Sequence, residues 1–211
     1  MTFLPDFSHE ADALRQGALR VAGVDEVGRG PLAGPVTAAA VVLEPGAIPE
    51  GLNDSKKLSA ARREALAAQI VDSADWAVAH IWPEEIDRLN IYHAAHLAMC
   101  RALAGLRAAA DFALVDGNRL PRDLPCAGLA VVKGDGRSLS IAAASIIAKV
   151  ARDRIMVDLA QQFPAYAWDR NAGYPTKQHL DALESHGVTP YHRRSFRPVH
   201  NILCRDISTS D

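Results

Sequence analysis

Short apolar segments recur along the chain and predict five β-strands. Several of them end at acidic residues followed by glycine, which is typical of strands bounded by turns. The expected strands are Val21–Val24, Val36–Leu43, Trp76–Ile81, Phe112–Val115 and Leu129–Val132. The second is expected to pair back on the first across a glycine- and proline-rich turn, and the last two have the composition of buried strands.

Apolar residues at three- and four-residue steps predict the helices. One helix is expected to begin after Ser59 as its N-cap, a short one opens at Pro83, and others cover Ile91–Leu106 and Thr176–His186. The strongest pattern consists of Ile141, Ala144, Ala148, Ala151, Ile155, Leu159 and Phe163. Because a hairpin comes first and strand–helix alternation follows, we expect an α/β sandwich around a mixed sheet.

Composition and charge indicate an ordinary folded domain and exclude several classes of protein. The chain has 211 residues, of which 49% are hydrophobic and 23% charged, as in an ordinary folded domain. The formal net charge is −2, so a polyanion would have to bind at a local basic patch or through metal ions. Three widely spaced cysteines exclude a disulfide scaffold. No segment resembles a signal peptide or membrane span, and we expect a cytoplasmic protein.

Acidic residues stand at the ends of three predicted strands. They are Asp25 and Glu26, Asp116, and Asp135. Taken singly, each is more commonly a turn or cap residue, because Asp-Gly is a common turn signal. Strand ends in α/β folds open into a crevice, where four converging carboxylates would repel one another unless cations intervened. Oxygen ligands without a histidine or cysteine cluster favour one or two Mg²⁺ or Mn²⁺ ions, which act on phosphate esters.

The glycine cluster Gly28–Gly34 follows the first acidic pair. A dinucleotide-binding turn would have to run into a helix, and Pro31 and Pro35 argue against one. The cluster is therefore expected to bring backbone close to a ligand, with Arg29 available for a phosphate. The alternative is a tight hairpin turn.

Two loops are further candidates for substrate contacts. Lys56 and Lys57 lie in a polar loop and could contact a phosphate backbone, although a solvated loop is equally compatible. Tyr174 lies on a Gly-Tyr-Pro turn, where its ring could stack on a sugar or base or simply pack against the protein.

The C-terminal segment has no acidic residue from Ser185 to Arg205. Its basic residues predict a modest patch for a nucleic-acid backbone. They are Arg193, Arg194, Arg197 and Arg205, with Tyr191 and Phe196 interleaved. The patch could be extended by Lys149, Arg152, His186 and His192, although such mixed-charge faces are usually only solvated.

Taken together, these segments resemble the bacterial ribonuclease HII enzymes. The resemblance depends on seven blocks that occur in family order over nearly the whole chain. They are Gly23–Pro35, Leu52–Leu58, Asp116–Asn118, Lys133–Asp135, Ser140–Val150, Gly173–Thr176 and His192–Phe196. The related type III enzymes carry an extra N-terminal domain, and the twenty residues before Val21 are too few for one.

The resemblance implies a ribonuclease H-like fold and metal-dependent cleavage of RNA in RNA–DNA hybrids. It also implies incision at single ribonucleotides in duplex DNA, leaving 5′-phosphate and 3′-hydroxyl ends. By the same resemblance, the metal-binding catalytic residues are Asp25, Glu26, Asp116 and Asp135. The resemblance also assigns Gly28, Arg29 and Gly30 to the ribose 2′-hydroxyl and Tyr174 to the sugar. The polar loop and the basic segment described above add Lys56, Arg193 and Arg194 as substrate-binding residues.

The expected organisation is an N-terminal extension over residues 1–20, a catalytic domain over 21–200 with a helical C-terminal segment, and a tail over 201–211. We expect a monomer with no membrane partner. Two rival functions stay open at this point. A nonenzymatic RNA–DNA binder leaves the carboxylates unexplained, and a hydrolase of small phosphate esters leaves the basic C-terminal segment unexplained.

Overall fold

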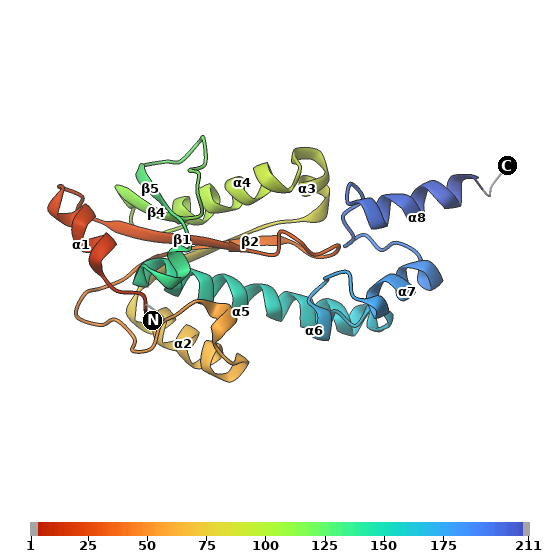
Figure 1. Ribbon diagram of the computed structural model, residues 1–211, viewed down its shortest axis with the longest axis horizontal. Coiled ribbons are helices and arrows are strands. Elements are labelled where there is room, and N and C mark those ends of the chain that lie inside the picture. The colour runs from red at the N-terminus through yellow and green to blue at the C-terminus, as the bar shows by residue number, and fades with distance from the viewer. Residues whose placement is uncertain (1–3, 209–211) are drawn as a thin grey trace. The chain divides into compact units, whose positions relative to one another are not determined.

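The computed structural model describes residues 4–208 and contains a five-stranded sheet with helices around it (Figure 1). The strands are β1 Val21–Val27, β2 Val36–Val42, β3 Asp75–Ile81, β4 Phe112–Asp116 and β5 Ala127–Val131. The α-helices are α1 Ser8–Arg15, α2 Ala60–Ser73, α3 Pro83–Leu89, α4 Ile91–Ala104, α5 Leu139–Gln162, α6 Trp168–Asn171, α7 Lys177–His186 and α8 Arg197–Ser208. Three short 3₁₀ helices are η1 Ser55–Lys57, η2 Gly134–Gly136 and η3 Pro164–Tyr166.

The sheet is mixed, and its strand order is β3-β2-β1-β4-β5. β1 and β2 form the expected antiparallel hairpin, with Val27 opposite Thr37. β4 pairs with β1 in parallel, and β5 pairs with β4 in parallel. The parallel pairs place the carboxyl ends of β1, β4 and β5 at one edge of the sheet, which confirms the predicted α/β architecture.

Several sequence-based predictions differ from the structure. β5 is an edge strand next to β4 and is not buried as predicted, since Leu129 is 48% exposed. The sequence pattern did not predict α1, α6 or α8. The expected tail boundary at residue 201 falls inside α8, and residues 1–3 and 209–211 lie outside the described part of the chain.

The chain divides into two compact units. The first unit comprises residues up to 27, 37–80 and 95–151, and the second comprises 28–36, 81–94 and the residues from 152 onward. The expected extension belongs to the first unit, where Ala13 of α1 joins a buried cluster with Val21 and Leu114. Within residues 4–208, no helix combines the length and apolar character needed to cross a bilayer.

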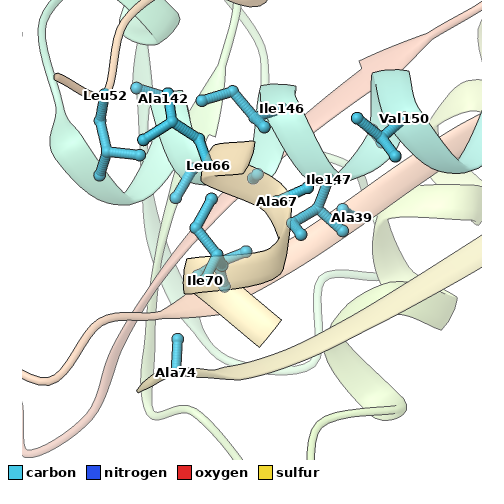
Figure 2. Packing of buried hydrophobic residues seen from close by; sticks show 14 of the residues in the cluster. Ala39, Leu52, Leu66, Ala67, Ile70, Ala74, Ala142, Ile146, Ile147 and Val150 are labelled. Carbon is cyan, nitrogen blue, oxygen red and sulfur yellow. The ribbon is translucent and has the colours of Figure 1, made fainter. Parts of the chain in front are cut away.

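The core of the first unit lies between α2, β2 and the first half of α5 (Figure 2). Ser59 caps α2 as predicted, because its side chain accepts a hydrogen bond from the backbone N–H of Arg62. The cap fixes the start of the helix, so that Leu66 and Ile70 point into the core. They pack against small and branched side chains of α5, among them Ala142, Ile146 and Ile147.

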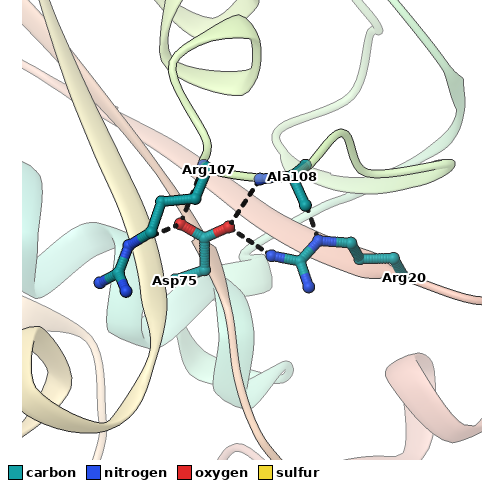
Figure 3. Close-up of polar contacts among 4 residues, drawn as sticks. All are labelled: Arg20, Asp75, Arg107 and Ala108. Atoms are coloured by element: carbon teal, nitrogen blue, oxygen red, sulfur yellow. Dashed lines mark hydrogen bonds and ion pairs between the residues drawn. The ribbon is translucent and has the colours of Figure 1, made fainter.

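A half-buried acidic side chain anchors the start of β3 (Figure 3). Asp75 pairs with the guanidinium of Arg20, and it accepts hydrogen bonds from the backbone N–H groups of Arg107 (3.1 Å) and Ala108 (3.3 Å). Arg20 also donates to the carbonyl oxygen of Ala108 at 3.1 Å. The contacts tie the segment before β1 to the loop after α4, and so they fix where β1 enters the sheet.

The second unit has its own aromatic core. Trp168 is fully buried and stacks on Tyr166, with ring centroids 5.1 Å apart. Leu32, Met156, Leu183 and Val199 are among the aliphatic side chains packed around them. Residues from four distant segments thus share one core, which is why this part of the chain forms a compact unit.

Candidate active site

Two neighbouring strands carry acidic residues to the same edge of the sheet. Val24 of β1 pairs with Val115 of β4, so the next residues, Asp25 and Asp116, follow in the same register. Residues at matching positions of adjacent parallel strands point to the same face. Asp25 is buried, and Asp116 is half-buried.

The other two acidic residues lie in η2 and on β1. Asp135 lies in η2 and is buried, and the neighbouring Gly134 donates its N–H to Asp116 Oδ1 at 2.6 Å. That hydrogen bond ties the turn carrying Asp135 to the end of β4. Glu26 follows Asp25 on β1, and its N–H donates to Asp25 Oδ1 at 2.7 Å.

The negative charges of these side chains act on one another. Burial is the first reason why the pKa of Asp25 is raised well above its usual range. Like charges add to the effect, in the order Glu26, Asp116 and Asp135. The pKa of Asp135 is raised as well, first by burial and then by Asp116. The structure therefore brings together the acidic residues that the sequence predicted.

The donor set fits a hard divalent cation by its chemistry. All four side chains offer carboxylate oxygens, and a cation would relieve the repulsion that raises the pKa of Asp25. Nowhere in residues 4–208 are three or more Asp, Glu, His or Cys side chains already arranged as a metal-binding group. Rotation of the carboxylates would therefore have to complete the coordination of an ion.

An open cleft of about 730 Å³ borders Asp135. Four cationic side chains line it, namely Lys56, Lys57, Lys133 and Arg137. Positive charge next to the carboxylates would attract a phosphate backbone that the carboxylates alone would repel. The sequence did not predict Lys133 and Arg137 as substrate contacts because they lie in no basic run, although their closeness to Asp135 along the chain was an available signal.

Lys56 interacts electrostatically with the acidic site. Burial on its own would lower the pKa of this ammonium group, but the pKa is raised because carboxylate charges outweigh burial. They act in the order Asp135, Asp25, Asp54 and Asp116. The Lys56 ammonium therefore stays charged beside the carboxylates, in keeping with its predicted contact with phosphate.

The second unit contains the predicted glycine cluster, which with the following Pro35 forms residues 28–35, here called the glycine loop. Gly28 has a φ of +89°, and a Cβ atom there would lie 2.2 Å from Nε of Arg152. Both the backbone angle and the space therefore require glycine. Arg29 and Gly30 at the tip of the loop are exposed, as a substrate contact would need.

Tyr174 packs beside the tip of the glycine loop. A Cβ atom on Gly30 would lie 3.2 Å from the Tyr174 ring, so the absence of a side chain there makes room for the ring. The turn is fixed by a hydrogen bond from Leu32 N–H to the Gly173 carbonyl at 2.8 Å. Tyr174 is 45% exposed, and the two predicted contact segments of this unit lie side by side.

A pair of buried histidines supports the Tyr174 turn. Thr189 donates its N–H to His192 Nδ1 at 3.0 Å, which leaves Nε2 of His192 to donate to His179 Nε2, also at 3.0 Å. His179 Nδ1 then carries the proton that bonds to the Tyr174 carbonyl at 2.9 Å. Both rings are neutral in this network, and burial lowers the pKa of His192 to about 3.

The structure contradicts the prediction that Arg193 contacts substrate. Arg193 is fully buried, and its guanidinium donates three hydrogen bonds to backbone carbonyl oxygens. The acceptors are Gly28 at 2.6 Å, Arg29 at 3.0 Å and Gly34 at 3.0 Å. Arg152 and His192, expected as possible extensions of the basic patch, are buried too. A side chain without solvent access cannot meet a phosphate.

Other arginines of the C-terminal segment are exposed. Arg194 projects into solvent, and its N–H donates to Asp87 at 2.9 Å, which fixes the backbone beside it. Arg197 is also exposed, whereas Arg205 pairs with Glu184 at 2.9 Å. Arg194 and Arg197 thus stay candidates for a phosphate contact, and the charge of Arg205 is partly compensated.

Comparisons with known proteins agree with the sequence resemblance. The family model described as Ribonuclease HII matches residues 22–199. A ribonuclease HII from Paracoccus denitrificans is 70% identical over 202 residues, which cover 96% of each chain. One from Cereibacter sphaeroides is 66% identical over 206 residues, covering 98% of this chain and 97% of the relative.

Comparison with solved structures also finds a ribonuclease H2 enzyme. The crystal structure of the ribonuclease H2 from Pyrococcus horikoshii matches with a TM-score of 0.78 at 29% identity. The match covers 89% of this chain and 98% of that one. The mixed sheet with flanking helices described above is the fold of that enzyme.

Proposed function

The chain belongs to the ribonuclease HII family and is a nuclease of the ribonuclease H type, and from that premise we propose that it cleaves the RNA strand of RNA–DNA hybrids and incises single ribonucleotides in duplex DNA. The observation that carries the proposal is the group of mutually interacting carboxylates, of which Asp135 borders a cleft lined with four cationic side chains. Carboxylates provide the chemistry of phosphodiester hydrolysis, and the cations supply attraction for a polyanion.

The predicted metal ligands keep that role in the proposal. They are Asp25, Glu26, Asp116 and Asp135, holding one or two Mg²⁺ or Mn²⁺ ions. When bound, such ions supply Lewis-acid activation of water and of the phosphoryl oxygens. Hydrolysis would leave 5′-phosphate and 3′-hydroxyl ends, and no covalent enzyme intermediate is needed.

The cationic cleft is proposed to hold the phosphate backbone. Lys56 and Lys57 come from η1, while Lys133 and Arg137 flank η2, so both sides of Asp135 carry positive charge. This lining supports a nucleic-acid substrate over a small phosphate ester, because four separated cations match several phosphates better than one. Family membership among nucleases already excludes the nonenzymatic binder.

The second unit is proposed to recognise the sugar. The exposed Arg29 and Gly30 would read the ribose 2′-hydroxyl, which alone distinguishes RNA from DNA at one position. The Tyr174 ring would support the neighbouring sugar. Arg194 would add a phosphate contact. We also propose that the enzyme acts as a monomer in the cytoplasm.

One assay tests the proposal. A duplex with a single embedded ribonucleotide, a long RNA–DNA hybrid and an all-DNA duplex are each incubated with Mg²⁺, Mn²⁺ or EDTA. We expect nicking of the first two substrates with metal, no nicking with EDTA, and no nicking of all-DNA duplex. Ligation and primer extension of the products report the 5′-phosphate and 3′-hydroxyl ends. Cleavage in EDTA, or metal-dependent cleavage of all-DNA duplex, would refute it.

A further inference from the structure

Two buried arginines surround the glycine loop, and neither has a place in the proposed chemistry. Arg193 donates to three carbonyl oxygens of this loop, as described above. Arg152 donates to three more carbonyl oxygens. They are Pro35 at 2.8 Å, Ala172 at 3.0 Å and Ala33 at 3.1 Å. Five of the six acceptors therefore belong to the glycine loop, and the sixth lies two residues before Tyr174.

Burying two guanidinium groups costs free energy, because each loses its hydration, and other interactions must offset that cost. Burial lowers the pKa of Arg193 to about 9 and that of Arg152 to about 10, so both groups stay protonated at neutral pH. A buried charge is tolerated when hydrogen bonds replace its hydration. Carbonyl dipoles of the glycine loop do so here, so the loop conformation and the two charges depend on each other.

The orientation of the carbonyl groups decides where the peptide N–H groups point. In a trans peptide, the C=O of one residue and the N–H of the next point in opposite directions. The carbonyls of Gly28 and Arg29 face the buried Arg193, so the N–H groups of Arg29 and Gly30 face away from it. Both residues are exposed, and these donors are therefore directed to the outer side of the loop.

We propose that Arg193 and Arg152 are positioning residues for ribose recognition. Arg193 sets the peptides of the loop tip so that their N–H groups meet the ribose 2′-oxygen. Arg152 joins the other half of the loop to the Tyr174 turn through Ala172. The inference rests on the proposed function, because it assigns the 2′-hydroxyl to these donors.

Neighbouring contacts hold Arg193 rigidly enough for this role. Its guanidinium carbon lies 5.1 Å from the centre of the Phe196 ring. Asp87 accepts the N–H groups of Arg194 and Ser195, both at 2.9 Å, which fixes the backbone directly after Arg193. A positioning role needs such rigidity, because a displacement of about 1 Å can cost roughly a hundredfold in rate.

Arg193→Lys provides the test. Lysine keeps one positive charge but cannot hold three carbonyls in a fixed fork. Arg88→Lys is the matched control, because Arg88 belongs to the same unit and its side chain is 72% exposed. For each protein, Kd is measured in EDTA for a duplex with one embedded ribonucleotide and for the same duplex without it. The metal-dependent kcat and KM are measured on the first substrate.

We expect Arg193→Lys to lose the preference for the ribonucleotide duplex while its Kd for all-DNA duplex stays unchanged. Its kcat should fall by about tenfold to a hundredfold, with a smaller change in KM, whereas Arg88→Lys should match the wild type. If Arg193 had only a structural role, Arg193→Lys would raise the Kd for both duplexes by the same factor. A folded Arg193→Lys variant with the wild-type preference would overturn the proposal.

The wild-type protein supplies a second readout should Arg193→Lys fail to fold. Backbone amide NMR signals of Arg29 and Gly30 are followed in EDTA while either duplex is added. We expect both signals to shift with the ribonucleotide duplex and not with all-DNA duplex, and identical shifts would overturn the inference. Wild-type enzyme that fails to nick the ribonucleotide duplex with metal would instead refute the proposed function.

Discussion

At the scale of single residues, Asp116 of the candidate active site has both a structural and an electrostatic role. Asp116 accepts the Gly134 N–H at 2.6 Å through Oδ1, and its negative charge contributes to the raised pKa of Asp25. The first role needs only an oxygen acceptor, whereas the second needs a charge. A substitution that keeps the oxygen and removes the charge can therefore separate them.

Asp116→Asn should abolish cleavage while leaving the protein folded. Asparagine retains an Oδ1 acceptor for Gly134, but it lacks the charge proposed to hold a metal ion. The measurements are kcat/KM on the embedded-ribonucleotide duplex, Tm, and Kd for the hybrid in EDTA. Turnover by folded Asp116→Asn at a rate near that of the wild type would contradict the assignment.

Tyr174 tests whether the aromatic ring or the hydroxyl contacts the sugar. Because the ring is exposed beside Gly30, we expect Tyr174→Phe to keep substantial activity. Tyr174→Ala should lose a stacking contact of about 1–3 kcal/mol, a loss of roughly tenfold to a hundredfold in kcat/KM. The loss should be greater on one embedded ribonucleotide than on a long hybrid. Equal defects in both variants would assign the role to the hydroxyl instead.

At the scale of elements, the first unit depends on the contact between α2 and α5. Ser59 fixes the start of α2, and the helical repeat then places Leu66 and Ile70 against Ile146 (Figure 2). The neighbouring Val71 points outward and is 39% exposed. Two adjacent β-branched residues of the same helix thus differ strongly in burial.

Ile70→Ala should lower the free energy of unfolding by about 2–5 kcal/mol, because it leaves a cavity in a packed core. Val71→Ala is the control in the same helical turn and should change it by less than about 0.5 kcal/mol. Urea unfolding followed by circular dichroism measures both values. Similar losses in the two variants would contradict the packing of α2 described above.

At the scale of the whole molecule, the buried histidine pair links stability to pH. Unfolded histidine binds a proton near its usual pKa of about 6.5. Folded His192, whose pKa is about 3, stays neutral between these values, and burial also lowers the pKa of His179. Unfolding therefore takes up protons in this window, and the stability contributed by neutral histidine is lost as the pH falls below about 6.5.

As the pH falls below about 6.5, the free energy of unfolding should decrease by up to about 1.4 kcal/mol per pH unit for each proton that a histidine takes up on unfolding. His192→Gln should flatten the slope by the contribution of one proton, whereas replacing the exposed His93 by Gln should leave it unchanged. Urea unfolding between pH 4 and 7 measures the slopes. A wild-type slope in His192→Gln would show that this imidazole is not kept neutral by the fold.

Local patterns were sufficient for the strands, most helices and the acidic positions. Apolar runs ending at Asp25 and Asp116 predicted both the strands and the carboxylates at their ends. A carboxylate marks the end of a buried strand because burying its charge in the core without a partner is unfavourable. The Ser59 cap was likewise predictable, since capping involves residues three apart. Motifs of this kind also sufficed for the resemblance to the ribonuclease HII family.

Only the tertiary structure decided which charged residues face solvent. Arg193 and Arg194 are adjacent and identical in type, yet one is buried among carbonyls and the other is exposed. The carbonyls that accept from Arg193 lie more than 150 residues earlier in the chain, a distance that no local pattern reports. In the same way, Lys133 and Arg137 meet Lys56 in one cleft because the fold places η1 beside η2. Burial and long-range hydrogen bonding are properties of the folded chain, so the roles of these cations could not be read from their spacing.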